Sequence, residues 1–128
     1  MRLEQTLGYI SIWNLVRGYY MKWYKNLYLG EGIAANARKT INKIKKNKPT
    51  IDVYVIALAS NPMNQLDIIP SWELLQKGYP TEQIRVIGLA KGKKEALQLV
   101  TSLVDEVYQK TGDVKILDYL KNEWREQI

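Results

Sequence analysis

The segment from Ile51 to Leu58 limits the fold more than any other part of the chain. It reads Ile-Asp-Val-Tyr-Val-Ile-Ala-Leu, a nearly continuous apolar run rich in β-branched residues, with Pro49 before it and Ser60-Asn61-Pro62 after it. A run of this length and composition is typical of a strand that is covered on both faces of a sheet. We therefore expect this segment to be the central strand of an α/β fold.

Helical and strand-like segments alternate on both sides of this run. The expected order is a long aromatic helix, a short strand at 26–29, helix 33–47, the central strand, helix 62–77 broken near Pro70, strand 84–89, helix 93–110 and a last helix at 115–124. Strands alternating with helices favour parallel pairing through right-handed crossovers. The expected fold is a small three-layer Rossmann-like α/β domain with a three-stranded parallel sheet, or a two-stranded one without the first strand.

The chain of 128 residues suits one such domain at 26–128, preceded by an aromatic and basic helix at 1–25. The uncharged run from Gln5 to Val16 in this helix is shorter than the roughly 20 residues that a membrane span needs. The opening residues lack the pattern of a secretory signal, and cysteine is absent. We expect a cytoplasmic protein, with peripheral contact to a membrane as the alternative.

Cysteine and histidine are both absent from the sequence. Their absence excludes disulfides, cysteine nucleophiles, zinc sites built on thiolate or imidazole, and the side chain best suited to proton transfer near neutral pH. A Ser60 nucleophile would need a lysine such as Lys91 as its base, and Asp67 and Glu73 are too isolated for acid and base roles. We therefore assign no catalytic residue, metal or cofactor, and expect a protein that is not an enzyme.

Positive charge is concentrated in the first half of the chain. Residues 1–50 hold ten basic and two acidic residues, whereas residues 51–128 hold nine basic and eleven acidic ones, for a net charge of +6. Such asymmetry favours an anionic partner, either nucleic acid or a membrane surface, although it also suits a solvated face. The candidate surface consists of Arg17, Lys22, Lys25, Arg38, Lys39, Lys43 and Lys46.

Aromatic residues are interleaved with these cations in the N-terminal segment. Rings beside cations suit a membrane interface or a surface on which the bases of a single strand stack. They equally suit packing on the sheet or on a second subunit, which would make the protein a homo-oligomer through this helix. The candidate interface consists of Trp13, Tyr20, Trp23 and Tyr24.

Three loops would follow the strands at the edge of a parallel sheet where ligands bind. The loop from Gly30 to Ala35 matches the letters of a dinucleotide-binding motif, but its strand is short and the expected acidic residue is represented only by Asp52. The loop from Gly88 to Lys94 offers amides and lysines at a helix start but departs from the Walker spacing. These loops fit either a phosphate-sized anion or ordinary turns. The candidate site consists of Gly30, Gly32, Ser60, Asn61, Lys91, Gly92 and Lys93.

Four blocks of the sequence are distinctive, at residues 54–62, 66–70, 88–92 and 106–112. Together they resemble a family of small bacterial proteins without an assigned activity. The resemblance implies a bacterial origin and carries no substrate, cofactor or site residue.

Two functions remain open from these observations. The first is a binding or adaptor protein whose basic, aromatic N-terminal half holds an anionic partner or another protein. The second is a small-ligand protein that binds a nucleotide or another phosphate-type anion at the carboxyl ends of the strands.

Overall fold

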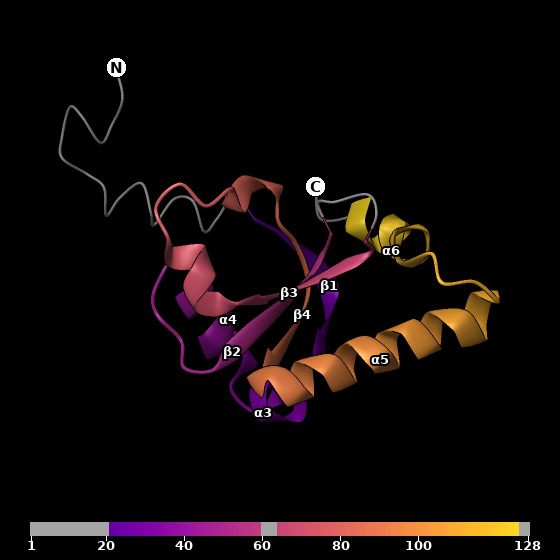
Figure 1. Ribbon diagram of the computed structural model, residues 1–128, viewed down its shortest axis with the longest axis horizontal. Helices are drawn as coiled ribbons and strands as arrows, with labels where there is room; N and C mark the ends of the chain where they lie inside the picture. Colours follow the sequence, from indigo (N-terminus) through magenta and orange to yellow (C-terminus); the bar gives the residue numbers. More distant parts are fainter. Residues whose placement is uncertain (1–20, 60–63, 126–128) are drawn as a thin grey trace, which may run out of the picture.

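A four-stranded mixed sheet lies at the centre of the molecule (Figure 1). The computed structural model describes residues 21–59 and 64–125. The strands are β1 (Lys22–Leu29), β2 (Val53–Leu58), β3 (Leu66–Pro70) and β4 (Arg85–Lys91), in the spatial order β1-β4-β2-β3. β1 is parallel to β4, whereas β2 is antiparallel to both of its neighbours. The prediction of a parallel Rossmann-like sheet is therefore wrong, while the prediction of the α/β class is confirmed.

The reversal of β2 has its cause in the segment expected to form a helix at 62–77. Residues 66–70 form β3, which pairs antiparallel with β2, and Ser71–Leu75 form the 3-10 helix η1. Consecutive residues of β3 point to opposite faces of the sheet: Ile68 packs in the cluster on one face and Ile69 in the cluster on the other. Pro70 ends the strand, where its missing N–H is tolerated. A second 3-10 helix, η2 (Thr81–Gln83), precedes β4.

β1 is twice as long as the short strand expected at 26–29. Residues 22–25, which the sequence assigned to the N-terminal helix, are its first half. Trp23 packs against one core cluster and Tyr24 is buried in the other, so both faces of the strand are covered. The rest of the expected helix, at 1–20, lies outside the described residues.

One face of the sheet is covered by α3 (Glu31–Ala34), α4 (Ala37–Lys45) and η1. A single helix was expected over 33–47, but it is divided after Ala34. Ile33 and Ile44 are buried, with Ala37 and Ile41 packed beside them, which is the apolar stripe that the spacing predicts. Asn47 adopts a left-handed φ of 54° and ends the helix.

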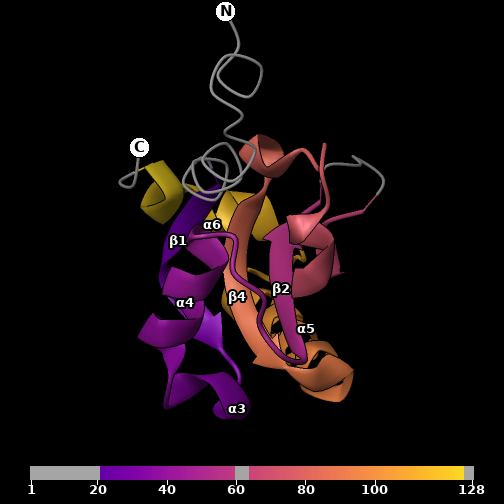
Figure 2. The same ribbon diagram turned by 90° about the vertical axis from the view of Figure 1, so that its left-hand side faces the viewer.

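The other face is covered by α5 (Gly92–Thr111) and α6 (Ile116–Arg125). The view turned by 90° places α4 and α5 on opposite sides of the sheet (Figure 2). Ala96, Leu103 and Val107 are the buried stripe of α5, and Gly112 ends it in the left-handed conformation as the sequence predicts. The three-layer arrangement is thus confirmed. Over the described ranges, no helix is both long and apolar enough to cross a membrane.

Candidate anion-binding surfaces

The candidate loops at 30–35 and 88–94 lie together at one end of the sheet. β1 and β4 are parallel, so their carboxyl ends are adjacent, and the Gly30 N–H donates to the Leu89 carbonyl at 2.9 Å. The candidate loop after β2 begins at the opposite end of the sheet, because β2 is antiparallel to β4. Val53 at the start of β2 pairs with Lys91, whereas Leu58 at its end pairs with Leu66. Ser60 and Asn61 themselves lie outside the described residues.

The side chain of Glu95 occupies the place between these two loops. One carboxylate oxygen accepts the Gly32 N–H at 2.8 Å, and the other accepts the Lys91 N–H. A Cβ atom on Gly30 would lie 2.3 Å from that second oxygen, and one on Gly32 would lie 2.5 Å from the Lys91 Cβ. The two glycines therefore make room for Glu95 and Lys91. Two amides that could hold an external anion already donate to an internal one.

The start of α5 is tied to the turn that precedes β2. Gly92 has a φ of 80°, which glycine adopts without strain, and its N–H donates to the Asp52 carbonyl at 2.7 Å. The Lys91 ammonium donates to the Ile51 carbonyl at 2.8 Å, while Lys93 is exposed. The chain passes directly from β4 into α5, so in place of the loop expected at 88–94 there is a compact hydrogen-bonded junction.

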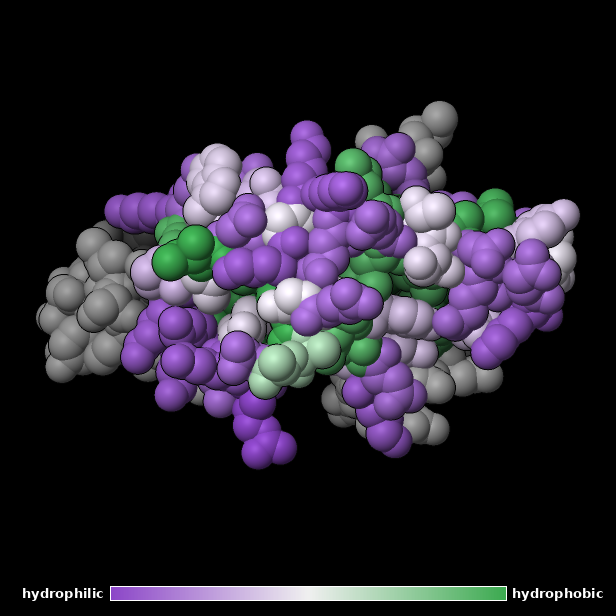
Figure 3. Space-filling view, turned by 90° about the horizontal axis from the view of Figure 1, so that it is seen from below, coloured by the Kyte–Doolittle hydropathy of each residue, from purple (hydrophilic) through white to green (hydrophobic). Residues whose placement is uncertain are grey.

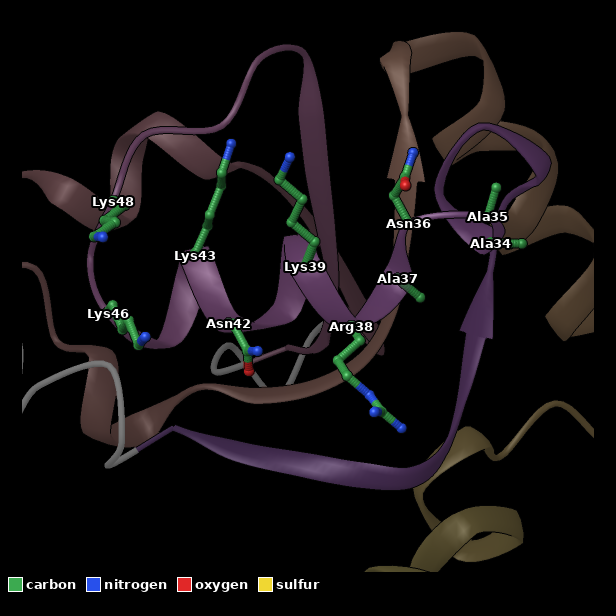
Figure 4. A pocket seen from close by; sticks show the side chains of 10 residues that line it. All are labelled: Ala34, Ala35, Asn36, Ala37, Arg38, Lys39, Asn42, Lys43, Lys46 and Lys48. Atoms are coloured by element: carbon green, nitrogen blue, oxygen red, sulfur yellow. The ribbon is translucent and has the colours of Figure 1, made fainter.

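An open groove of about 670 Å³ follows the outer side of α4. Half of its ten lining residues are basic and none is acidic, and the labelled side chains extend outward from the helix and its two ends (Figure 4). The basic residues are Arg38, Lys39, Lys43, Lys46 and Lys48; the others are Ala34, Ala35, Asn36, Ala37 and Asn42.

The position of this groove follows from the apolar pattern of α4. Because Ala37, Ile41 and Ile44 face the sheet, the cations between them are directed away from it. Lys45 is different: its ammonium lies 5.4 Å from the centroid of the Trp23 ring, a cation–π contact. The sequence predicted Arg38, Lys39, Lys43 and Lys46; it missed Lys48 because that residue comes after the helix.

The structure describes four of the other residues assigned to the basic and aromatic surfaces, and none of these four lines the groove. Lys22 and Lys25 are exposed on β1 and do not line the groove. Tyr24 is 6% exposed, and Trp23 is partly buried beneath Lys45. Arg17, Trp13 and Tyr20 lie outside the described residues.

Three polar side chains join β1, α5 and α6 on the opposite face. The hydroxyls of Tyr28 and Tyr119 both donate to one oxygen of Glu106, at 2.7 and 2.9 Å. The Tyr28 ring stacks on Tyr24 with 6.1 Å between centroids. Burial, and after it the hydrogen bond to Glu106, raises the pKa of Tyr28 well above its ordinary value.

This cluster predicts a loss of stability at alkaline pH. Above about pH 10 a tyrosine in the unfolded chain ionises, whereas Tyr28 in the folded protein keeps its proton. The unfolded state then binds fewer protons, so the free energy of unfolding falls as pH rises; below that pH the contribution is intact. We expect the urea midpoint to fall between about pH 9 and about pH 11, and to fall less in Tyr28→Phe. An equal fall in both proteins would show that Tyr28 is not its source.

Metal binding and comparison with other proteins add nothing to the site as far as the described residues show. Among residues 21–59 and 64–125, no group of three or more acidic side chains is placed to hold a metal ion. Comparison with protein-family models, with curated proteins and with solved structures gives no match.

Proposed function

We propose that the protein binds nucleic acid through the sugar-phosphate backbone, using the groove along α4. The supporting observation is that five cations and no carboxylate line this groove. Neutralising phosphates with lysine and arginine releases condensed counterions, which is the main source of affinity in binding that is independent of sequence.

The spacing of the lysines suits a run of phosphates. Lys39, Lys43 and Lys46 follow one another at intervals of four and three residues along α4 and its C-cap, which places them on one side of the helix. At 1.5 Å per residue they span about 10 Å. Phosphates of one strand in a duplex are about 3.4 Å apart along the axis, so this row can meet about three of them.

The remaining lining residues favour contacts to the backbone over contacts to bases. Asn36 and Asn42 offer amides, and the other three lining residues are alanines. Bases of a single strand stack on aromatic rings, and none of the described residues that line this groove is aromatic. We therefore propose binding that is independent of sequence.

A membrane surface is supported less well by the same residues. Interfacial binding needs apolar side chains that enter the lipid beside the cations. Among the groove residues only alanines are apolar, and the nearby Trp23 is partly buried under Lys45. The anion site at the strand ends also has less support, because Glu95 already accepts from Gly32 and Lys91.

Salt dependence and charge reversal test the proposal. We expect the affinity for a mixed-sequence oligonucleotide, measured by fluorescence anisotropy, to fall steeply with salt, and each lysine replaced by alanine to reduce the log-log slope by about one. Lys39→Glu/Lys43→Glu is expected to weaken binding at least about tenfold at about 50 mM salt. These lysines are exposed or half-buried on the outer side of α4, so the fold should be unaffected.

The matched control is Lys77→Glu/Lys121→Glu, which changes the net charge equally at exposed positions outside the groove. We expect it to retain most of the affinity. Equal weakening by both pairs would mean that only net charge matters. Absence of oligonucleotide binding, or retention on anionic vesicles in its place, would overturn the proposal.

A further inference from the structure

The side of α5 that does not face the sheet carries an exposed apolar stripe. Leu97 and Tyr108 are 51% and 55% exposed, and Val100 and Val104 are partly buried between them. Intervals of three and four residues place all four on one side of the helix. The face seen from below in Figure 1 shows hydrophobic side chains in patches among hydrophilic ones (Figure 3).

A groove accompanies this stripe toward the carboxyl end of α5. Its volume is about 420 Å³, and apolar side chains provide most of its surface. Leu97 lies one turn before the groove begins, at the amino-terminal end of the stripe. The lining residues are Val100, Thr101, Val104, Asp105, Tyr108 and Val114.

Charges flank the stripe with opposite sign at its two ends. Lys94 precedes Leu97 by three residues, and Asp105 precedes Tyr108 by three, so each lies about one turn from an exposed apolar side chain and close to the same side of the helix. Lys94 and Asp105 are both exposed. The stripe is therefore positive at its amino end and negative at its carboxyl end.

We propose that a second copy of this chain docks on this stripe, with the two α5 helices antiparallel about a two-fold axis near Val100 and Thr101. In this arrangement the Leu97 side chain of each copy enters the groove of the other, opposite Val104. Lys94 of each copy faces the partner subunit's Asp105. Two-fold symmetry repeats each contact, so the whole interface consists of the Leu97 side chain in the groove and the Lys94–Asp105 pair, each present twice.

The charge pattern selects this direction over the alternative. Lys94 and Asp105 lie on the same flank of the stripe. A parallel pair, whose two-fold axis runs along the helices, would set these flanks on opposite sides of the contact and leave all four charges without an opposite charge. An antiparallel pair places each Lys94 near an Asp105 and covers the exposed Leu97 and Tyr108 side chains of both copies. Because the stripe from Leu97 to Tyr108 is only about 16 Å long, the buried area lies at the small end for specific complexes and we expect a weak dimer.

This dimer does not depend on nucleic-acid binding. α4 and α5 cover opposite faces of the sheet, so both α4 grooves stay open when α5 is paired. A dimer would present two basic grooves, which raises the effective concentration for a long polyanion. The two proposals can therefore fail separately.

Sedimentation equilibrium of the full chain tests the dimer. Over about 5 to about 500 μM we expect a monomer–dimer equilibrium, with dissociation in the micromolar range as for small interfaces. Leu97→Gln should weaken association at least about tenfold, the scale of losing one well-packed anchor. Ser102→Asp, an exposed position on the same helix outside the groove, is the control and should associate as the wild type does.

A charge exchange distinguishes this geometry from any other dimer. Lys94→Asp and Asp105→Lys should each weaken association, since each sets like charges opposite one another, and the double variant should restore it. Circular dichroism confirms that each variant is folded. A protein that stays monomeric throughout, a dimer indifferent to Leu97→Gln, or a double variant that is not restored would each overturn the proposal.

Discussion

The Leu103→Ala variant is expected to lose about 2 to 5 kcal/mol of unfolding free energy. Leu103 is 2% exposed and lies at the middle of α5, in the cluster that contains Ile56, Ile87 and Leu120. Truncation removes buried apolar surface and leaves a cavity that α5, β4 and α6 all line. Urea unfolding followed by circular dichroism measures the loss, and the slope of unfolding free energy against urea concentration should remain unchanged.

Ser102→Ala on the same helix is the control for this measurement. Ser102 is exposed, so its truncation should change stability by no more than about 0.5 kcal/mol. Similar losses of unfolding free energy in the two variants would mean that Leu103 is not buried between α5 and the sheet. The arrangement of layers would then be wrong.

The Gly88→Ala variant is expected to lose about 1 to 3 kcal/mol, although it adds a single methyl group. Gly88 pairs with Tyr28 of β1 and Ile56 of β2, and both ladders shift register beside it. A Cβ atom there would lie 2.7 Å from the Tyr28 carbonyl oxygen and 3.3 Å from the Leu99 side chain. A backbone atom cannot move aside as a side chain does, so β1 has to separate from β4.

Gly112→Ala provides the comparison, because it separates crowding from backbone strain. Gly112 has a φ of 74°, and a Cβ atom there would have no neighbour within 4 Å. Its replacement should cost about 1 to 2 kcal/mol through the left-handed conformation alone. In native-state hydrogen exchange, only Gly88→Ala should speed the exchange of amides that join β1 to β4. Unchanged protection of those amides would contradict the predicted clash.

The sequence predicted most accurately the elements with a strong local signal. The extended apolar stripe of α5 and its glycine stop are confirmed, as are the strand at Val53–Leu58 and the basic outer side of α4. The two helices follow from the spacing of their apolar residues, whereas the strand follows from a continuous β-branched run between turn residues.

The errors fall on short segments, where periodicity does not distinguish a strand from a helix. Residues 66–70 carry apolar side chains that fit either one, and Pro62 after Ser60 resembles a helix start. Assigning this one segment to a helix made β2 parallel to the next strand in the prediction. A helical crossover brings the chain back to the end of the sheet where the first strand began, so the next strand runs parallel to it, whereas a hairpin makes the next strand antiparallel. The same step placed Ser60 and Asn61 beside the other loops, although β2 ends at the opposite end of the sheet.

The hydrogen bonds of Glu95 to two backbone amides could not be predicted from its neighbours in sequence. Its carboxylate reaches Gly32, which lies in α3, 63 positions earlier. A glycine pair typical of phosphate binding is equally suited to an internal carboxylate, and only the three-dimensional arrangement distinguishes the two.

The parallel pairing of β1 with β4 has a consequence for the order of events during synthesis. Lys22 pairs with Arg85, so β1 leaves the ribosome long before the strand that completes its hydrogen bonds. The β2–β3 hairpin joins neighbouring residues and can close as soon as it emerges. The nascent chain therefore carries an unpaired strand edge at 22–29 until residue 91 is available, and this edge is where association with other nascent chains would begin.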